Sequence, residues 1–113
     1  MGVSLPAGNP VSRTLMEGDI IEALRGIYDP EIPVSIYDMG LIYEIRIAAG
    51  GAVEIDMTLT APGCPVAVSL PIEVEEKVRK VRGVRDVVVE IVWDPPWTPD
   101  RMSEEAKLEL GWL

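Results

Sequence analysis

Residues 41–60 read LIYEIRIAAGGAVEIDMTLT, and this stretch decides the fold because apolar and polar residues alternate on both sides of a glycine pair. A period of two is typical of a strand with one face in a core and the other in water. The core-facing set is Leu41, Tyr43, Ile45 and Ile47, followed by Val53, Ile55, Met57 and Leu59. Because Gly50 and Gly51 supply a turn between the two runs, the stretch predicts a β-hairpin.

Helical patterns flank this hairpin on both sides. Thr14 and Glu17 match a capping box, which predicts a first helix over about residues 15–27. After the hairpin, apolar residues at helical spacing predict a second, amphipathic helix that ends at Gly83. These residues are Val66, Leu70, Val74, Val78 and Val81. Pro71 lies within the pattern, so we expect the helix either to bend there or to begin near Pro71.

The remaining elements complete a small α+β fold. Residues 84–93 predict a third strand, the proline-rich residues 94–99 cannot join a ladder, and Ser103 begins a short last helix. We therefore expect a two-layer sandwich in the order α-β-β-α-β-α, with helices packed on one face of a three-stranded mixed sheet. We expect residues 15–113 to form a single domain, after a flexible N-terminal segment over residues 1–14.

Composition excludes several functional classes. The chain has 113 residues, with 10 basic and 19 acidic side chains, and a net charge of −9 disfavours nucleic acid as a partner. No apolar stretch approaches the roughly 20 residues of a membrane span. The absence of histidine removes catalytic arrangements and metal sites that need an imidazole. One free cysteine and no recognisable export signal favour a cytoplasmic location.

Cys64 is the most informative single residue. It lies between Gly63 and Pro65, where a predicted strand ends and a predicted helix begins. A helix N-terminus favours the thiolate form, which is both a nucleophile and a soft metal ligand. The alternative is a small buried hydrophobic residue, which is the common fate of a free cysteine.

Further candidates precede this cysteine in the sequence. Asp29 and Glu31, in Asp-Pro-Glu-Ile-Pro, are two carboxylates on a proline-stiffened loop that could serve as acid and base or as metal ligands. The alternative is a turn in which Asp29 caps its own backbone. Thr58 and Thr60 lead towards Cys64, and the Thr60 hydroxyl is placed to approach the thiol; the alternative is an exposed strand threonine.

Two other segments have structural interpretations. Trp93 and Trp97 flank Asp-Pro-Pro and are either interface anchors or a loop packed over the core. Gly40, in Asp-Met-Gly, indicates a turn whose conformation other residues resist.

A ligand count limits the cofactors. A closed zinc or iron–sulfur site takes four protein ligands, whereas one chain offers a single sulfur and no imidazole. The sequence therefore disfavours a permanent cluster and allows a transient one, with Cys64 as the metal ligand. A homodimer would double the available sulfur.

Together these motifs resemble one family. Asp29–Pro33, Tyr37–Tyr43, Thr58–Pro65 and Trp93–Pro99 occur in the order and spacing typical of the SufT/PaaD-like family of small iron–sulfur assembly proteins, most closely its bacterial SufT branch. The resemblance covers residues 17–112. It implies a compact α/β domain of the SUF system that helps to mature iron–sulfur proteins.

The resemblance also implies roles and partners. In the family Cys64 is the residue implicated in function, with Asp29, Glu31 and Thr60 near it, and the partners are iron–sulfur scaffolds or carriers and client apo-proteins. We expect a non-enzymatic assembly or transfer factor. The alternatives are an adaptor with an inert cysteine, an accessory for assembling a phenylacetate-type oxygenase, and a thiol peroxidase. The peroxidase lacks a resolving cysteine and a histidine base.

Overall fold

A computed structural model describes residues 10–28, 33–60 and 69–111. Along the chain the elements are α1 (Pro10–Leu24), β1 (Ile42–Ile47), β2 (Ala52–Met57), α2 (Ser69–Arg79), β3 (Asp86–Ile91), a short 3-10 helix (Pro99–Arg101) and α3 (Glu104–Glu109). The predicted α+β order is confirmed. Among the described residues, no helix is long and apolar enough to cross a membrane.

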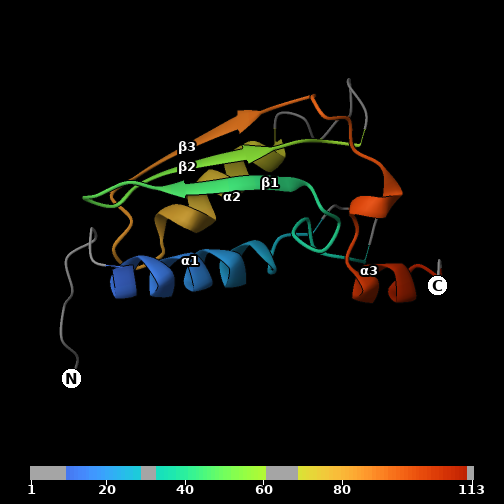
Figure 1. Cartoon of the computed structure of the whole chain (residues 1–113), viewed down its shortest axis with the longest axis horizontal. Coiled ribbons are helices and arrows are strands. Elements are labelled where there is room, and N and C mark those ends of the chain that lie inside the picture. Colours follow the sequence, from blue (N-terminus) through green and yellow to red (C-terminus); the bar gives the residue numbers. More distant parts are fainter. Residues whose placement is uncertain (1–9, 29–32, 61–68, 112–113) are drawn as a thin grey trace.

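The three strands form one mixed sheet in the order β1-β2-β3. β1 and β2 pair antiparallel as the predicted hairpin, and β3 pairs parallel to β2 with Val89 opposite Ile55. The parallel pairing requires a crossover, which α2 supplies. Figure 1 shows α1 and α2 on one face of the sheet, while α3 lies beyond the end at which β1 begins.

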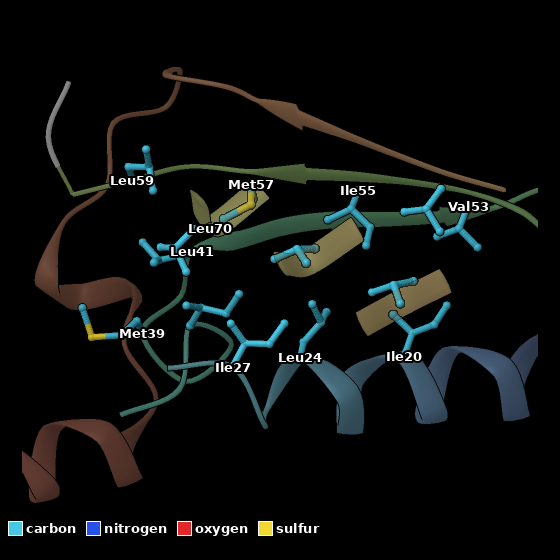
Figure 2. Packing of buried hydrophobic residues seen from close by; sticks show 14 of the residues in the cluster. Ile20, Leu24, Ile27, Met39, Leu41, Val53, Ile55, Met57, Leu59 and Leu70 are labelled. Atoms are coloured by element: carbon cyan, nitrogen blue, oxygen red, sulfur yellow. The ribbon is translucent and has the colours of Figure 1, made fainter. Parts of the chain in front are cut away.

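The core fills the space between the sheet and these two helices (Figure 2). Its fully buried side chains include Ile20 and Leu24 of α1, Val53, Ile55 and Met57 of β2, and Val74 and Val78 of α2. Each buried side chain of this size stabilises the fold by about 1.5–3 kcal/mol relative to an exposed one. The alternation in β2 and the helical stripe in α2 therefore point to the same core, as predicted.

The predicted bounds of α1 are wrong at both ends. The helix begins at Pro10, so that Thr14 lies inside it rather than at a cap. A proline suits a first helical position because its missing N–H has no partner there. The helix ends at Leu24, after which Gly26 and Ile27 form a tighter turn through bonds to carbonyls three residues earlier.

The two later helices follow their sequence signals. Pro71 is the third residue of α2, where no carbonyl inside the helix awaits its missing N–H, so the expectation of a helix beginning near Pro71 is confirmed. At α3 the Ser103 hydroxyl accepts a hydrogen bond from the Ala106 N–H at 3.1 Å, which is the predicted N-cap.

Candidate functional site

β2 runs directly towards the part of the chain that carries Cys64. Backbone bonds hold the end of this strand on both sides. The Thr58 N–H donates to the Leu41 carbonyl at 2.8 Å, and the Val92 N–H donates to the Met57 carbonyl at 2.8 Å. Cys64 itself, within residues 61–68, lies outside the described residues.

The two threonines of this strand end differ in burial. Thr60 is exposed, and its approach to the thiol stays a prediction. Thr58 is fully buried, and its hydroxyl has no hydrogen-bond partner among the described residues. An exposed strand threonine is therefore wrong for Thr58, because tertiary packing covers a position that the alternation assigns to water. A buried, unpaired hydroxyl costs about 1–3 kcal/mol.

The residues on either side of the segment that contains Asp29 and Glu31 are held together after the end of α1. Tyr28 and Ser35 form an isolated antiparallel bridge, and the Ile36 N–H donates to the Ile27 carbonyl at 2.9 Å. These contacts fix the chain on both sides of residues 29–32. Asp29 and Glu31 themselves lie outside the described residues.

A short series of backbone hydrogen bonds links the end of β2 to the turn that follows α1. Ile27 accepts from Ile36, Ile36 accepts from Leu41 at 3.1 Å, and Leu41 accepts from Thr58. Figure 2 shows Ile27, Leu41 and Leu59 at the same end of the core. The described residues that flank the Asp29–Glu31 segment and those that precede the Cys64 segment therefore meet at one end of the sheet.

An open pocket of about 280 Å³ lies beside the Tyr28–Ser35 bridge. Its lining residues are Tyr28, Pro33, Val34, Ser35 and Asp38 from the turn, and Glu105, Ala106 and Glu109 from α3. The Ser35 hydroxyl donates to Asp38 Oδ2 and accepts from the Asp38 N–H, each at 3.1 Å. Arg25 Nε lies 4.0 Å from Asp38 Oδ1. Sequence reasoning assigned Asp38 only to a turn, and nothing local to it indicates that α3 completes a pocket.

Residues 95–103, which we call the C-terminal segment, pack over the start of β1. Trp97 Nε1 donates to the Met39 carbonyl at 2.8 Å, and the Tyr43 hydroxyl donates to the Pro95 carbonyl at 2.8 Å. The Arg101 guanidinium stacks 4.5 Å from the centre of the Tyr43 ring. Trp97 therefore packs down as one alternative predicted.

Trp93 is exposed, whereas Gly40 lies in a closely packed turn. Trp93 remains 46% exposed, beyond the end of β3. Gly40 has a φ of +79°, which confirms the predicted turn conformation, and it lies directly against the Arg101 backbone.

The water-facing side of the hairpin carries an ion-pair cluster around Arg46. Its guanidinium donates to both oxygens of Asp56, at 2.8 and 2.9 Å, and to Glu44 Oε2 at 2.8 Å. Arg46 Nε lies 3.6 Å from Glu54. The hydrogen bond from Arg46 lowers the pKa of Asp56 below its ordinary value, and the carboxylates raise the pKa of Arg46.

Within the described ranges, no group of three acidic or cysteine side chains could hold a metal ion. The ligand count over the whole sequence gives one thiol and no imidazole. One chain therefore lacks the four sulfur or imidazole ligands of a closed zinc or iron–sulfur site.

Comparison with known proteins gives consistent matches. A family model described as iron–sulfur cluster assembly protein matches residues 17–91. An Fe-S protein maturation auxiliary factor of Porphyromonas gingivalis is 52% identical over 97 residues, which cover 86% of this chain and 92% of that protein. The Fe-S protein maturation auxiliary factor YitW of Bacillus subtilis is 42% identical over 96 residues, covering 85% and 94%.

A solved structure gives the same result for the fold. The chain superposes on a domain of unknown function, DUF59, from Bacillus anthracis with a TM-score of 0.84 and 35% identity. The superposition covers 91% of this chain and 98% of that one.

Proposed function

The chain belongs to the iron–sulfur cluster assembly protein family, and from this premise we propose that it is an auxiliary maturation factor that acts through Cys64. The Cys64 thiolate binds iron or a cluster for a short time and passes it on. Asp29, Glu31 and Thr60 shape the surroundings of the sulfur. The protein carries and hands over its cargo and is not an enzyme.

One structural observation carries this proposal. The described residues before the Cys64 segment and those around the Asp29–Glu31 segment are linked through Leu41 and Ile36 by backbone hydrogen bonds. Two segments attached to one end of a rigid sheet are favourably placed to act on one cargo. The proximity of the thiol to the carboxylates is part of the proposal.

The chemistry is ligand exchange on iron. As the cargo arrives, a bond forms between iron and the Cys64 sulfur while a bond to a donor ligand breaks. When a client thiolate binds, the bond to Cys64 breaks in turn, and no electrons are transferred. A single thiolate suits this role because a full set of four would hold the cluster permanently.

The partners follow from this exchange. The donor is an iron–sulfur scaffold or carrier protein, and the acceptor is a client apo-protein. Two copies of the chain would provide two thiolates, so a homodimer that brings two Cys64 residues together is part of the proposal.

The test compares wild type with Cys64→Ser. Both proteins are incubated anaerobically with iron and sulfide, and cluster absorbance and transfer to an apo-ferredoxin are measured. We expect Cys64→Ser to lose both. Equal binding and transfer would contradict the proposal.

Cellular complementation separates the adaptor alternative. Cys64→Ser is introduced into a strain that lacks the gene, and iron–sulfur enzyme activities are compared with wild type. Full activity would identify an adaptor with an inert cysteine. Thr60→Ala is expected to give a partial loss, and Thr98→Ala, at an exposed threonine in the C-terminal segment, serves as its matched control.

A further inference from the structure

We propose that the helix-free face of the sheet is the surface on which a basic partner protein docks. We call it the acidic face, and it consists of Glu44 and Arg46 on β1, Glu54 and Asp56 on β2, and Asp86, Val88 and Glu90 on β3. Figure 1 shows that α1 and α2 both lie on the opposite side of the sheet.

Three carboxylates lie side by side across this face. In the strand register Asp56 is opposite Glu44 on β1 and opposite Glu90 on β3. Like charges at directly opposite positions destabilise a sheet. Arg46 compensates the first pair, because it bonds to both Glu44 and Asp56. Among the described residues no ion pair reaches Glu90, so part of the repulsion stays uncompensated.

The face as a whole is short of positive charge. It carries five carboxylates and one arginine, and that arginine already contacts three of the five. Asp86 has Arg79 at a distance of 4.0 Å, from the helix side of the edge. A face with such an excess of carboxylates attracts a basic surface and repels nucleic acid. A second copy of this chain would present the same charge, so a face-to-face dimer is disfavoured.

An apolar side chain lies within the acidic residues. Val88 is 53% exposed, between Asp86 and Glu90 along β3 and opposite Glu54 on β2. An apolar contact inside a charged rim is the usual arrangement of a protein interface. The matching surface has an apolar side chain flanked by lysine or arginine.

Along β2 the acidic face ends at Asp56, because the next residue of the alternation, Thr58, is fully buried. The face is linked to the candidate site through the chain, since β2 leads into the segment that carries Cys64. This docking proposal depends on the proposed function in one respect only, namely that the partner belongs to the iron–sulfur assembly machinery.

Photo-crosslinking tests where the partner docks. Benzoylphenylalanine is placed at Val88, or as a control at Leu15, which is 62% exposed on α1. After irradiation of cells of the native host, mass spectrometry identifies the partner and its crosslinked residues. We expect at least about fivefold more crosslinking from Val88, to a lysine- or arginine-rich surface of an iron–sulfur assembly protein. Equal yields, a crosslinked surface without basic residues, or crosslinking to a second copy would overturn the proposal.

Charge variants test the mechanism of docking. In the Val88-labelled protein, Glu90→Gln should lower crosslinking about threefold or more and should not lower the melting temperature, since it removes a repulsive charge. Glu22→Gln, at an exposed position of α1, is the matched control and should change neither quantity. Equal loss in both variants would indicate a general effect of net charge and contradict a specific docking face.

Cys64→Ser separates docking from cargo binding. With Val88 labelled, this variant should crosslink as wild type does, because docking does not use the thiol. Preserved crosslinking together with normal client maturation would contradict the role of Cys64 and leave the docking face supported. Absence of crosslinking in wild type, with maturation dependent on Cys64, would overturn the docking face alone.

Discussion

Replacing Gly40 with alanine should loosen the C-terminal segment from the start of the sheet and destabilise the whole domain. Gly40 has a φ of +79°, which costs an L-residue about 1–2 kcal/mol. A Cβ added at this position would lie 2.2 Å from the Arg101 carbonyl oxygen and 2.7 Å from its carbonyl carbon. Both neighbours are backbone atoms, so no side-chain rotation relieves the clash.

The total cost follows from the contacts on either side. The two segments must separate by about 1 Å to reach an ordinary contact distance. That movement breaks the hydrogen bond from the Ser103 N–H to the Asp38 carbonyl, at 2.8 Å, and weakens the bond from Trp97 to the Met39 carbonyl. At about 1 kcal/mol for the broken bond and up to about 1 kcal/mol for the weakened one, together with the backbone strain, the free energy of unfolding should fall by about 2–4 kcal/mol.

Thermal and urea unfolding, followed by circular dichroism and tryptophan fluorescence, measure this loss. A change of about 3 kcal/mol should lower the melting temperature by more than about 10 °C. Gly18→Ala is the matched control, because nothing lies within 4 Å of its added Cβ in α1 and alanine favours a helix by about 0.5–1 kcal/mol. A loss below about 1 kcal/mol for Gly40→Ala would refute the reasoning.

Two further predictions concern β2 and the residue that follows it. Thr58→Val should raise the free energy of unfolding by about 1 kcal/mol, since it removes a buried hydroxyl that has no partner among the described residues. Urea unfolding measures this change, and a decrease would mean that the hydroxyl is hydrogen-bonded in the intact protein. Asp56→Asn should destabilise the protein at pH 7. Arg46 lowers the pKa of Asp56, so the pair contributes stability above about pH 4 and loses it as the pH falls through the lowered pKa. The difference between wild type and variant should therefore shrink at pH 3, and an undiminished difference would contradict this assignment.

The sequence alone is sufficient to predict most of the fold, because the deciding signals are local. The alternation over residues 41–60 and the Gly50–Gly51 turn specify a hairpin within one short stretch. The pairing direction of β3 is not local, since a strand pattern is the same in either direction. The bounds of α1 were misplaced because Thr14 and Glu17 are three residues apart, a spacing that also occurs inside a helix.

Site prediction has a different limit. The contacts that enclose the end of the sheet join residues far apart in the chain, such as Tyr43 with Pro95 and Trp97 with Met39. Only Gly40 leaves a local trace of this packing. The burial of Thr58 is likewise tertiary. The roles of Cys64, Asp29 and Glu31 remain predictions, because these residues lie outside the part of the chain that the structure describes.

The packing of the C-terminal segment over the start of β1 also has a consequence for biosynthesis. Trp97 is made 58 residues after Met39, whose carbonyl it caps, and Ser103 follows later still. All three strands are thus synthesised before the segment that covers the start of β1. A product of premature termination after Ile91 would retain every strand but would leave the start of β1 uncovered, and we expect proteolysis to begin there.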